Sequence, residues 1–184
     1  MRNSFPGGAF VSPASPFHFR IAARICRQHP GTQVTLVAYP LAPLNPAPET
    51  YPTLVKLYHS MAKEATDSNQ EFIISGDSAG GNLALSLPLH ILSTSPESLA
   101  PAKIVAIVPA CTTDTSILSE VAPNDPALSP AVFDLVREQW GGEWGGDDPR
   151  ISPLYADMSV LQKRDVQVFI LSAGSDSCAP GQLT

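Results

Sequence analysis

Four short segments of the chain are near-continuous runs of apolar residues with many β-branched side chains. These runs cover residues 34–39, 72–75, 103–108 and 166–172. None shows the apolar–polar alternation of a strand with one face in water, so each is typical of a strand that is buried on both faces. The pattern therefore predicts a parallel sheet covered by helices.

Helical patterns alternate with these runs. Apolar residues recur every three or four positions over 17–26 and 51–65, and a third helix, which includes 83–89, opens near Ser78. Because proline lacks an N–H group and clashes with the preceding turn, we expect Pro88 to kink or end that third helix. Strands that alternate with helices predict an α/β fold with right-handed crossovers.

Residues 112–148 interrupt this alternation. They contain several prolines and the run WGGEWGGDDP, with one helical pattern at 131–140. We expect this segment to be a cap-like insertion beside a site. No repeat and no linker divides the chain, so we expect a single partial domain over 1–184.

Composition narrows the class of protein. A length of 184 residues is enough for one domain with a core, and 43% apolar with 15% charged residues is globular composition. A net charge of −6 without a basic run argues against nucleic acid and anionic membranes as partners. The longest apolar run, 104–110, is far shorter than the roughly 20 residues that span a bilayer. We therefore expect no nucleic-acid partner and no integral membrane segment.

The cysteines and the first residues bear on the compartment. Cys26, Cys111 and Cys178 show neither metal-ligand spacing nor a paired framework, which favours a reducing compartment and no metal site. The opening MRNSFPGGAF lacks the apolar stretch of a secretory signal. The expected location is the cytoplasm, and the oligomeric state is left open.

The pentad Gly76-Asp77-Ser78-Ala79-Gly80 is a G-x-S-x-G pattern that follows a predicted strand and opens a predicted helix. Glycines on both sides of the serine let strand and helix pass closely. The helix N-terminus places N–H groups and a partial positive charge beside the serine, and such groups suit the negative oxygen of a tetrahedral intermediate. In this context the pentad predicts a nucleophilic Ser78, and a glycine-rich turn without catalytic consequence is the alternative.

Two further segments carry candidate chemistry. Gly7 and Gly8 form a glycine pair that either supplies more oxyanion donors from a loop or is an ordinary flexible turn. Asp176 follows the last predicted strand, where sites form in parallel sheets, and either orients a histidine or belongs to a simple turn.

The histidines do not supply an expected base. All four histidines precede Asp176, and three of them lie in or at the ends of helical patterns. The four are His18, His29, His59 and His90. We expect none of them to be catalytic. A serine without a base is a poor nucleophile at neutral pH.

Five motifs in a shared order resemble the hormone-sensitive-lipase-like esterases, the fold-3 group of the α/β-hydrolase superfamily. In this chain they are 6–10, 39–43, 76–84, 148–154 and 173–176. They are similar, in that order, to the family's oxyanion loop, its Tyr-Arg-Leu-Ala-Pro segment, its nucleophile elbow, its Asp-Pro-x-x-Ser-Pro-Leu loop and the strand end that bears the acid.

The resemblance implies a function and a set of roles. The family hydrolyses small-molecule carboxylic esters through an acyl-enzyme, without a metal or organic cofactor. Carried over residue by residue, Ser78 is the nucleophile and Asp176 is the triad acid. The N–H groups of Gly7, Gly8 and Ala79 form the oxyanion hole.

Three departures from the family pattern change the expectation. Pro6 stands where the family has a histidine, and its ring locks one φ angle of the loop. The family's triad histidine follows the acid, and this sequence has no histidine there. The chain begins where the family's third strand ends, so we expect an incomplete α/β-hydrolase fold without the N-terminal strands and the last strand. Since the third strand lies between those matching 34–39 and 72–75, a central strand would be absent.

Three interpretations follow for the function. The sequence favours a serine hydrolase of carboxylic esters that is incomplete and weakly active or inactive as this chain. The first alternative is a non-catalytic small-molecule-binding homologue that keeps the pocket and has lost the base. The second is an active enzyme that uses another base in a different geometry.

Overall fold

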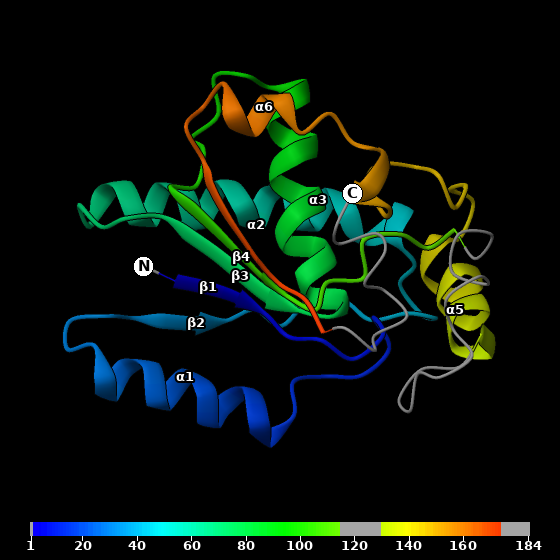
Figure 1. Ribbon diagram of the computed structural model, residues 1–184, viewed down its shortest axis with the longest axis horizontal. Coiled ribbons are helices and arrows are strands. Elements are labelled where there is room, and N and C mark those ends of the chain that lie inside the picture. The colour runs from blue at the N-terminus through cyan, green and yellow to red at the C-terminus, as the bar shows by residue number, and fades with distance from the viewer. Residues whose placement is uncertain (1, 115–129, 174–184) are drawn as a thin grey trace.

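The computed structural model describes residues 2–114 and 130–173 (Figure 1). Within these residues, five parallel strands form one sheet in the order β2-β1-β3-β4-β5. The strands are β1 (Arg2–Phe5), β2 (Val34–Leu36), β3 (Ile73–Asp77), β4 (Lys103–Ile107) and β5 (Gln167–Leu171). The predicted α/β fold with a parallel sheet flanked by helices is confirmed.

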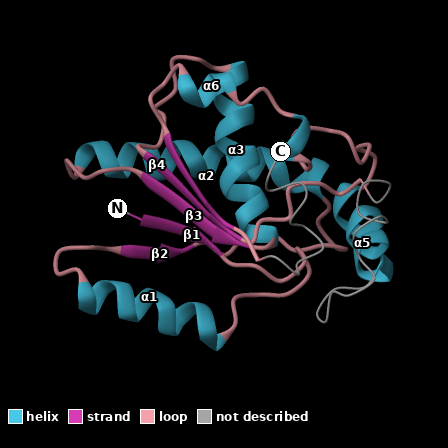
Figure 2. Cartoon of the chain, viewed as in Figure 1, coloured by secondary structure: helices cyan, strands magenta, loops and turns pink. Residues whose placement is uncertain are grey.

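Helices lie on both sides of this sheet (Figure 2). On one side α1 (Pro16–Gln28) packs against β2. On the other side α3 (Ala79–Thr94) packs against β1, β3 and β4, and α2 (Ala47–Asp67) packs on α3. The short helix α6 (Ser159–Gln162) also contacts α3. Because the strands are parallel, their carboxyl ends all lie at the same edge of the sheet, and helical crossovers connect them.

The described residues within the 112–148 segment include the helix that the sequence predicts. It runs as α5 (Pro130–Val136) and continues as a π-helical turn, η2 (Arg137–Gly141). A 3-10 turn, η3 (Pro153–Tyr155), follows. Residues 115–129 lie outside the described part of the chain, so the cap-like insertion and the domain boundaries stay predictions.

The expectation that a central strand is absent is wrong. Residues Arg2–Phe5 form β1, which lies between β2 and β3, with Ser4 opposite both Leu36 and Ser75. The sequence RNSF has no apolar run because only its second and fourth residues face the main core. Asn3 and Phe5 are both fully buried, and the Asn3 amide has no hydrogen-bond partner among the described residues.

Pro88 does not end the third helix. It lies inside α3, which continues for six more residues to Thr94. Almost every residue of α3 from Ala79 to Leu92 is buried. Tertiary packing of this kind outweighs the local cost of a proline within a helix.

The two faces of the sheet are covered to different extents. Residues of β1, β3 and β4 that face α3 are buried, whereas on the opposite face Ile107 is 36%, Phe169 52% and Leu171 61% exposed. We call the first the closed face (Phe5, Ile74, Ile104 and Ala106) and the second the open face (Val105, Ile107, Phe169 and Leu171). The edge strand β5 is exposed on both faces, since Ile170, on the α3 side, is 41% exposed. Among the described residues, the expected burial therefore holds on the closed face of β3 and β4 and fails on β5.

Candidate active site

Ser78 lies on the turn between β3 and α3, as the pentad predicts. Its backbone has φ 50° and ψ −118°, a left-handed conformation that is strained for a residue with a side chain. Three hydrogen bonds hold this backbone. The Ser78 N–H donates to the Ile107 carbonyl at 2.9 Å, and its carbonyl accepts from the N–H groups of Asn82 at 3.0 Å and Ala110 at 3.2 Å. Strain that is held this firmly is typical of a functional turn.

The glycines of the motif are required by close backbone contacts. A Cβ atom at Gly76 would clash with the Gly80 carbonyl, and one at Gly80 would clash with the Phe5 carbonyl of β1. At Gly81 a Cβ would lie 3.0 Å from Pro109 Cα. Three glycines thus allow α3 to start directly against β1 and β3, which brings the first turn of the helix beside the loop that follows β1.

Asn82 connects the turn at Ser78 to two segments that are distant in sequence. Its side-chain amide donates to the carbonyls of Ala110 at 2.6 Å and Ile151 at 2.7 Å. Ser152, in the same segment as Ile151, accepts from the Thr113 N–H at 2.8 Å through its hydroxyl oxygen. These buried bonds fix the 148–154 segment beside the first turn of α3.

The loop that follows β1 is held in an unusual conformation. Its residues Gly8, Ala9 and Phe10 all have positive φ angles, of 135°, 53° and 61°. The Tyr39 hydroxyl donates to the Pro6 carbonyl at 2.9 Å, and the Phe10 ring stacks on Trp140 with ring centroids 4.4 Å apart. These contacts anchor the loop at both ends.

The Tyr39 hydroxyl acts as a neutral donor in this contact. Burial raises the pKa of Tyr39, and the nearby charge of Asp77 raises it further. The phenol therefore keeps its proton at neutral pH, so its bond to the Pro6 carbonyl persists.

The N–H groups of this loop differ in how they are used. The Gly7 N–H donates to Asp77 Oδ1 at 3.1 Å, so it is already engaged. Neither Gly8 nor Ala9 has an acceptor for its N–H among the described residues. The N–H of Ala79, at the start of α3, belongs to the first turn of a helix, where amides lack an intrahelical partner. Sequence reasoning missed Ala9, because only the folded loop distinguishes its N–H from that of Gly7.

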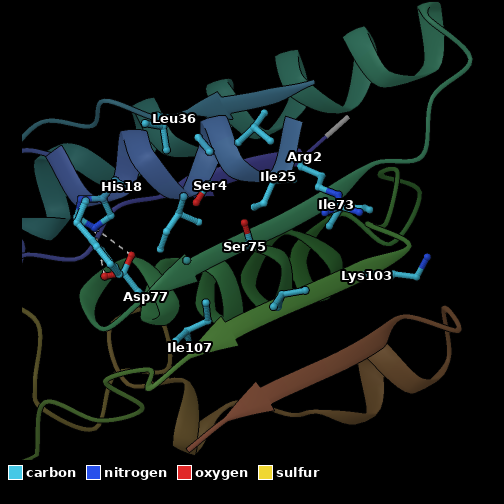
Figure 3. Close-up of a pocket in the computed structure, with 16 residues that line it drawn as sticks. Arg2, Ser4, His18, Ile25, Leu36, Ile73, Ser75, Asp77, Lys103 and Ile107 are labelled. Carbon is cyan, nitrogen blue, oxygen red and sulfur yellow. Dashed lines mark hydrogen bonds and ion pairs between the residues drawn. The ribbon is translucent and has the colours of Figure 1, made fainter. Parts of the chain in front are cut away.

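Sequence reasoning also missed a hydrogen bond between His18 and Asp77, the residue that precedes Ser78. His18 Nε2, at the start of α1, is 3.2 Å from Asp77 Oδ1 and 3.3 Å from Oδ2. The two side chains close one end of a groove of about 340 Å³ between α1 and the sheet (Figure 3). No local sequence signal joins residues 59 positions apart.

The other site expectations have different outcomes. All four histidines lie in described parts of the chain, and none of them hydrogen-bonds Ser78. The ring of His59 packs edge-on to Tyr58, and that of His90 packs edge-on to Tyr51. Asp176, the expected triad acid, lies outside the described residues. No metal-binding cluster occurs among the residues described.

Comparison with known proteins gives the chain its relatives. The family model of the alpha/beta hydrolase fold matches residues 4–182. An esterase of Acinetobacter venetianus is 32% identical over 167 residues, which are 88% of this chain and 53% of the relative. The chain thus spans about half the length of that relative.

Solved structures agree on the fold. A carboxyl esterase from the fungus Tuber melanosporum has a TM-score of 0.81 at 21% identity, over 98% of this chain and 60% of that one. A hormone-sensitive lipase from a metagenome library has a TM-score of 0.71 at 25% identity, over 93% and 67% of the two chains. Within the described residues, no helix has the length and hydropathy needed to cross a membrane.

Proposed function

Because the chain belongs to the alpha/beta hydrolase fold family, in its hormone-sensitive-lipase-like group, we propose that its site is built to hydrolyse carboxylic esters with Ser78 as the nucleophile. The observation that carries this proposal is the strained Ser78 backbone, φ 50°, on a turn that opens a buried helix. No structural role in the described residues requires a serine with positive φ at that point.

The proposed chemistry is acyl transfer in two steps. Ser78 Oγ attacks the ester carbonyl carbon while a base takes its proton, and the alcohol leaves with a proton to give an acyl-enzyme. Water then attacks the acyl carbonyl carbon, the carboxylic acid leaves, and Ser78 Oγ takes back its proton. By resemblance, Asp176 is the acid that would orient a histidine base.

The oxyanion donors that we propose are the N–H groups of Gly8, Ala9 and Ala79. The first two have no acceptor among the described residues, and the third opens α3, where the helix dipole favours negative charge. Gly7, expected from the sequence to be a donor, has its N–H on Asp77 instead. In this proposal Gly7 shapes the loop and the next two amides stabilise the tetrahedral intermediate.

Activity of this chain alone is expected to be low. None of the four histidines hydrogen-bonds Ser78, and enzymes that lose one triad member keep only about 10³–10⁴-fold catalysis over water. The test is hydrolysis of a short-chain aryl ester by wild type and Ser78→Ala. Ser75→Ala is the matched control, because Ser75 lies three residues earlier, in β3. We expect slow hydrolysis that Ser78→Ala removes and Ser75→Ala keeps.

Two results would change the proposal. Equal rates in wild type and Ser78→Ala would remove Ser78 from the mechanism. If esters raise the melting temperature without any Ser78-dependent product, the chain is a binding protein, as the first alternative from the sequence holds.

A further inference from the structure

The hydrogen bonds of His18 define its tautomer. The Ser15 N–H donates to His18 Nδ1 at 2.9 Å, and a backbone N–H has no capacity to accept. The Ser15 hydroxyl lies 3.0 Å from the same nitrogen and, unlike the N–H, can either donate or accept, so the backbone contact decides the assignment. Nδ1 is therefore the unprotonated nitrogen of the ring, and the ring hydrogen sits on Nε2. That hydrogen points at the Asp77 carboxylate, 3.2 Å and 3.3 Å from its two oxygens (Figure 3).

The same Asp77 carboxylate also binds the glycine loop. Its Oδ1 accepts the Gly7 N–H at 3.1 Å, and a Cβ atom at Gly7 would clash with Oδ2. The Asp77 side chain is 35% exposed, so water competes for its oxygens, whereas the His18 side chain is only 11% exposed. A donor that is mostly shielded from water keeps a part-exposed carboxylate aimed at one amide.

We propose that His18 is a positioning residue for the oxyanion loop. Its Nε2–H holds Asp77, and Asp77 holds the Gly7 N–H, so the next two amides, of Gly8 and Ala9, are presented toward Ser78. The inference rests on the proposed function for what those amides do. The Ser15–His18–Asp77–Gly7 relay itself is independent of any turnover. Since Asp77 directly precedes Ser78, one residue sets the loop against the nucleophile.

The first test is ¹⁵N NMR of the histidine ring nitrogens in the wild-type chain. The relay requires His18 to carry a hydrogen on Nε2, with Nδ1 showing the shift of an unprotonated nitrogen. A ring protonated on Nδ1 would overturn the proposal, because Nδ1 could not then accept the Ser15 N–H.

The second test is hydrogen exchange of the Gly7 amide in three variants. His18→Ala removes the donor to Asp77, and His18→Gln places a side-chain N–H near the position of Nε2. His29→Ala is the matched control, because His29 caps the other end of α1 and is exposed. We expect the Gly7 amide to exchange about tenfold faster or more in His18→Ala, and near the wild-type rate in the other two. Unchanged exchange in His18→Ala would overturn the proposal.

The third measurement separates this inference from the proposed function. Where Ser78-dependent hydrolysis is measurable, His18→Ala should lower kcat with little change in KM, and His18→Gln should restore part of it. If hydrolysis does not depend on Ser78, the proposed function fails while the two NMR results still decide the relay. If His18→Ala does not fold, the ring tautomer and the amide exchange of Asp77→Asn, which keeps one acceptor oxygen, decide it instead.

Discussion

The closed and open faces of the sheet are made by the same strands, yet their surroundings differ. On the closed face Ile74, Ile104 and Ala106 have no exposed surface, and α3 above them is buried along nearly its whole length. On the open face α1 packs against β2 and has no buried residue of its own, so the apolar side chains of β4 and β5 stay exposed.

This difference shows where the rigid support of the site comes from. The turn at Ser78 is the start of α3, so the well-packed layer fixes Ser78, the proposed nucleophile. The glycine loop follows β1 and leads to α1, which is packed far less tightly. The His18–Asp77 pair joins the two, which is why we assign it the task of holding the loop.

The largest expected effect comes from the same substitution on opposite faces of β4. Ile104→Ala removes a fully buried side chain under α3 and should lower the free energy of unfolding by about 2–5 kcal/mol. Ile107→Ala removes a side chain that is 36% exposed on the open face, and it should cost less than about 1.5 kcal/mol. Urea denaturation of both variants measures the difference.

Equal costs for the two variants would contradict the comparison. They would mean that the open face is covered in solution. Sedimentation of the wild-type chain at several concentrations would then show whether a second copy covers it.

The sequence predicted the parts of the fold that depend on local pattern. Each of the four apolar runs became a strand, because runs rich in β-branched residues favour extended backbone. It missed β1, because Asn3 and Phe5 face the core from a segment too short and too polar to stand out. It also could not tell that apolar residues such as Phe169 and Leu171 face outward, because apolar character does not specify what covers a face.

The site likewise has a part that the sequence could predict and a part that it could not. The elbow at Ser78 was predictable because strand, turn and helix are consecutive in sequence. The bond between His18 and Asp77 was not, since 59 residues separate them and β1 and α1 must both be placed before they meet. The capture of the Gly7 N–H likewise depends on the folded position of Asp77.

A second prediction concerns binding of an apolar dye such as anilinonaphthalene sulfonate. Exposed apolar side chains on β5 beside the groove under α1 should bind the dye in the folded protein. Leu171→Ser removes a side chain that is 61% exposed, so it should reduce dye fluorescence clearly with less than about 1 kcal/mol change in stability. Leu44→Ser is the control, because Leu44 is exposed away from the groove, and it should leave the fluorescence unchanged.

The outcome that would count against the open face is specific. Dye binding that is equal in wild type and Leu171→Ser, or equally reduced by Leu44→Ser, would show that the dye reports general surface character instead of this face.

The smallest expected effect tests whether the packing on the closed side of the sheet extends to the end of α3. His90, near the end of α3, packs edge-on to Tyr51 of α2 with ring centroids 5.4 Å apart. Tyr51 in turn contacts Trp144, and the Arg150 guanidinium lies 3.6 Å above that ring. Burial lowers the pKa of His90 from its ordinary value near 6.5, and the charge of Arg150 lowers it further. His90 is therefore neutral in the folded chain over a pH range in which the unfolded chain binds a proton.

The sign of the pH effect follows from this difference. As pH falls from about 7.5 toward 5.5, the unfolded state takes up the His90 proton first, so the folded state loses stability. Thermal melts should show a small decrease in melting temperature over this range, and His90→Gln should flatten it. His29→Gln, an exposed change on α1, is the control and should keep the wild-type slope. Equal slopes for His90→Gln and wild type would mean that His90 is not buried between α3 and α2. A histidine that is fully solvated has the same pKa in the folded and unfolded chains, so it adds no pH dependence to stability.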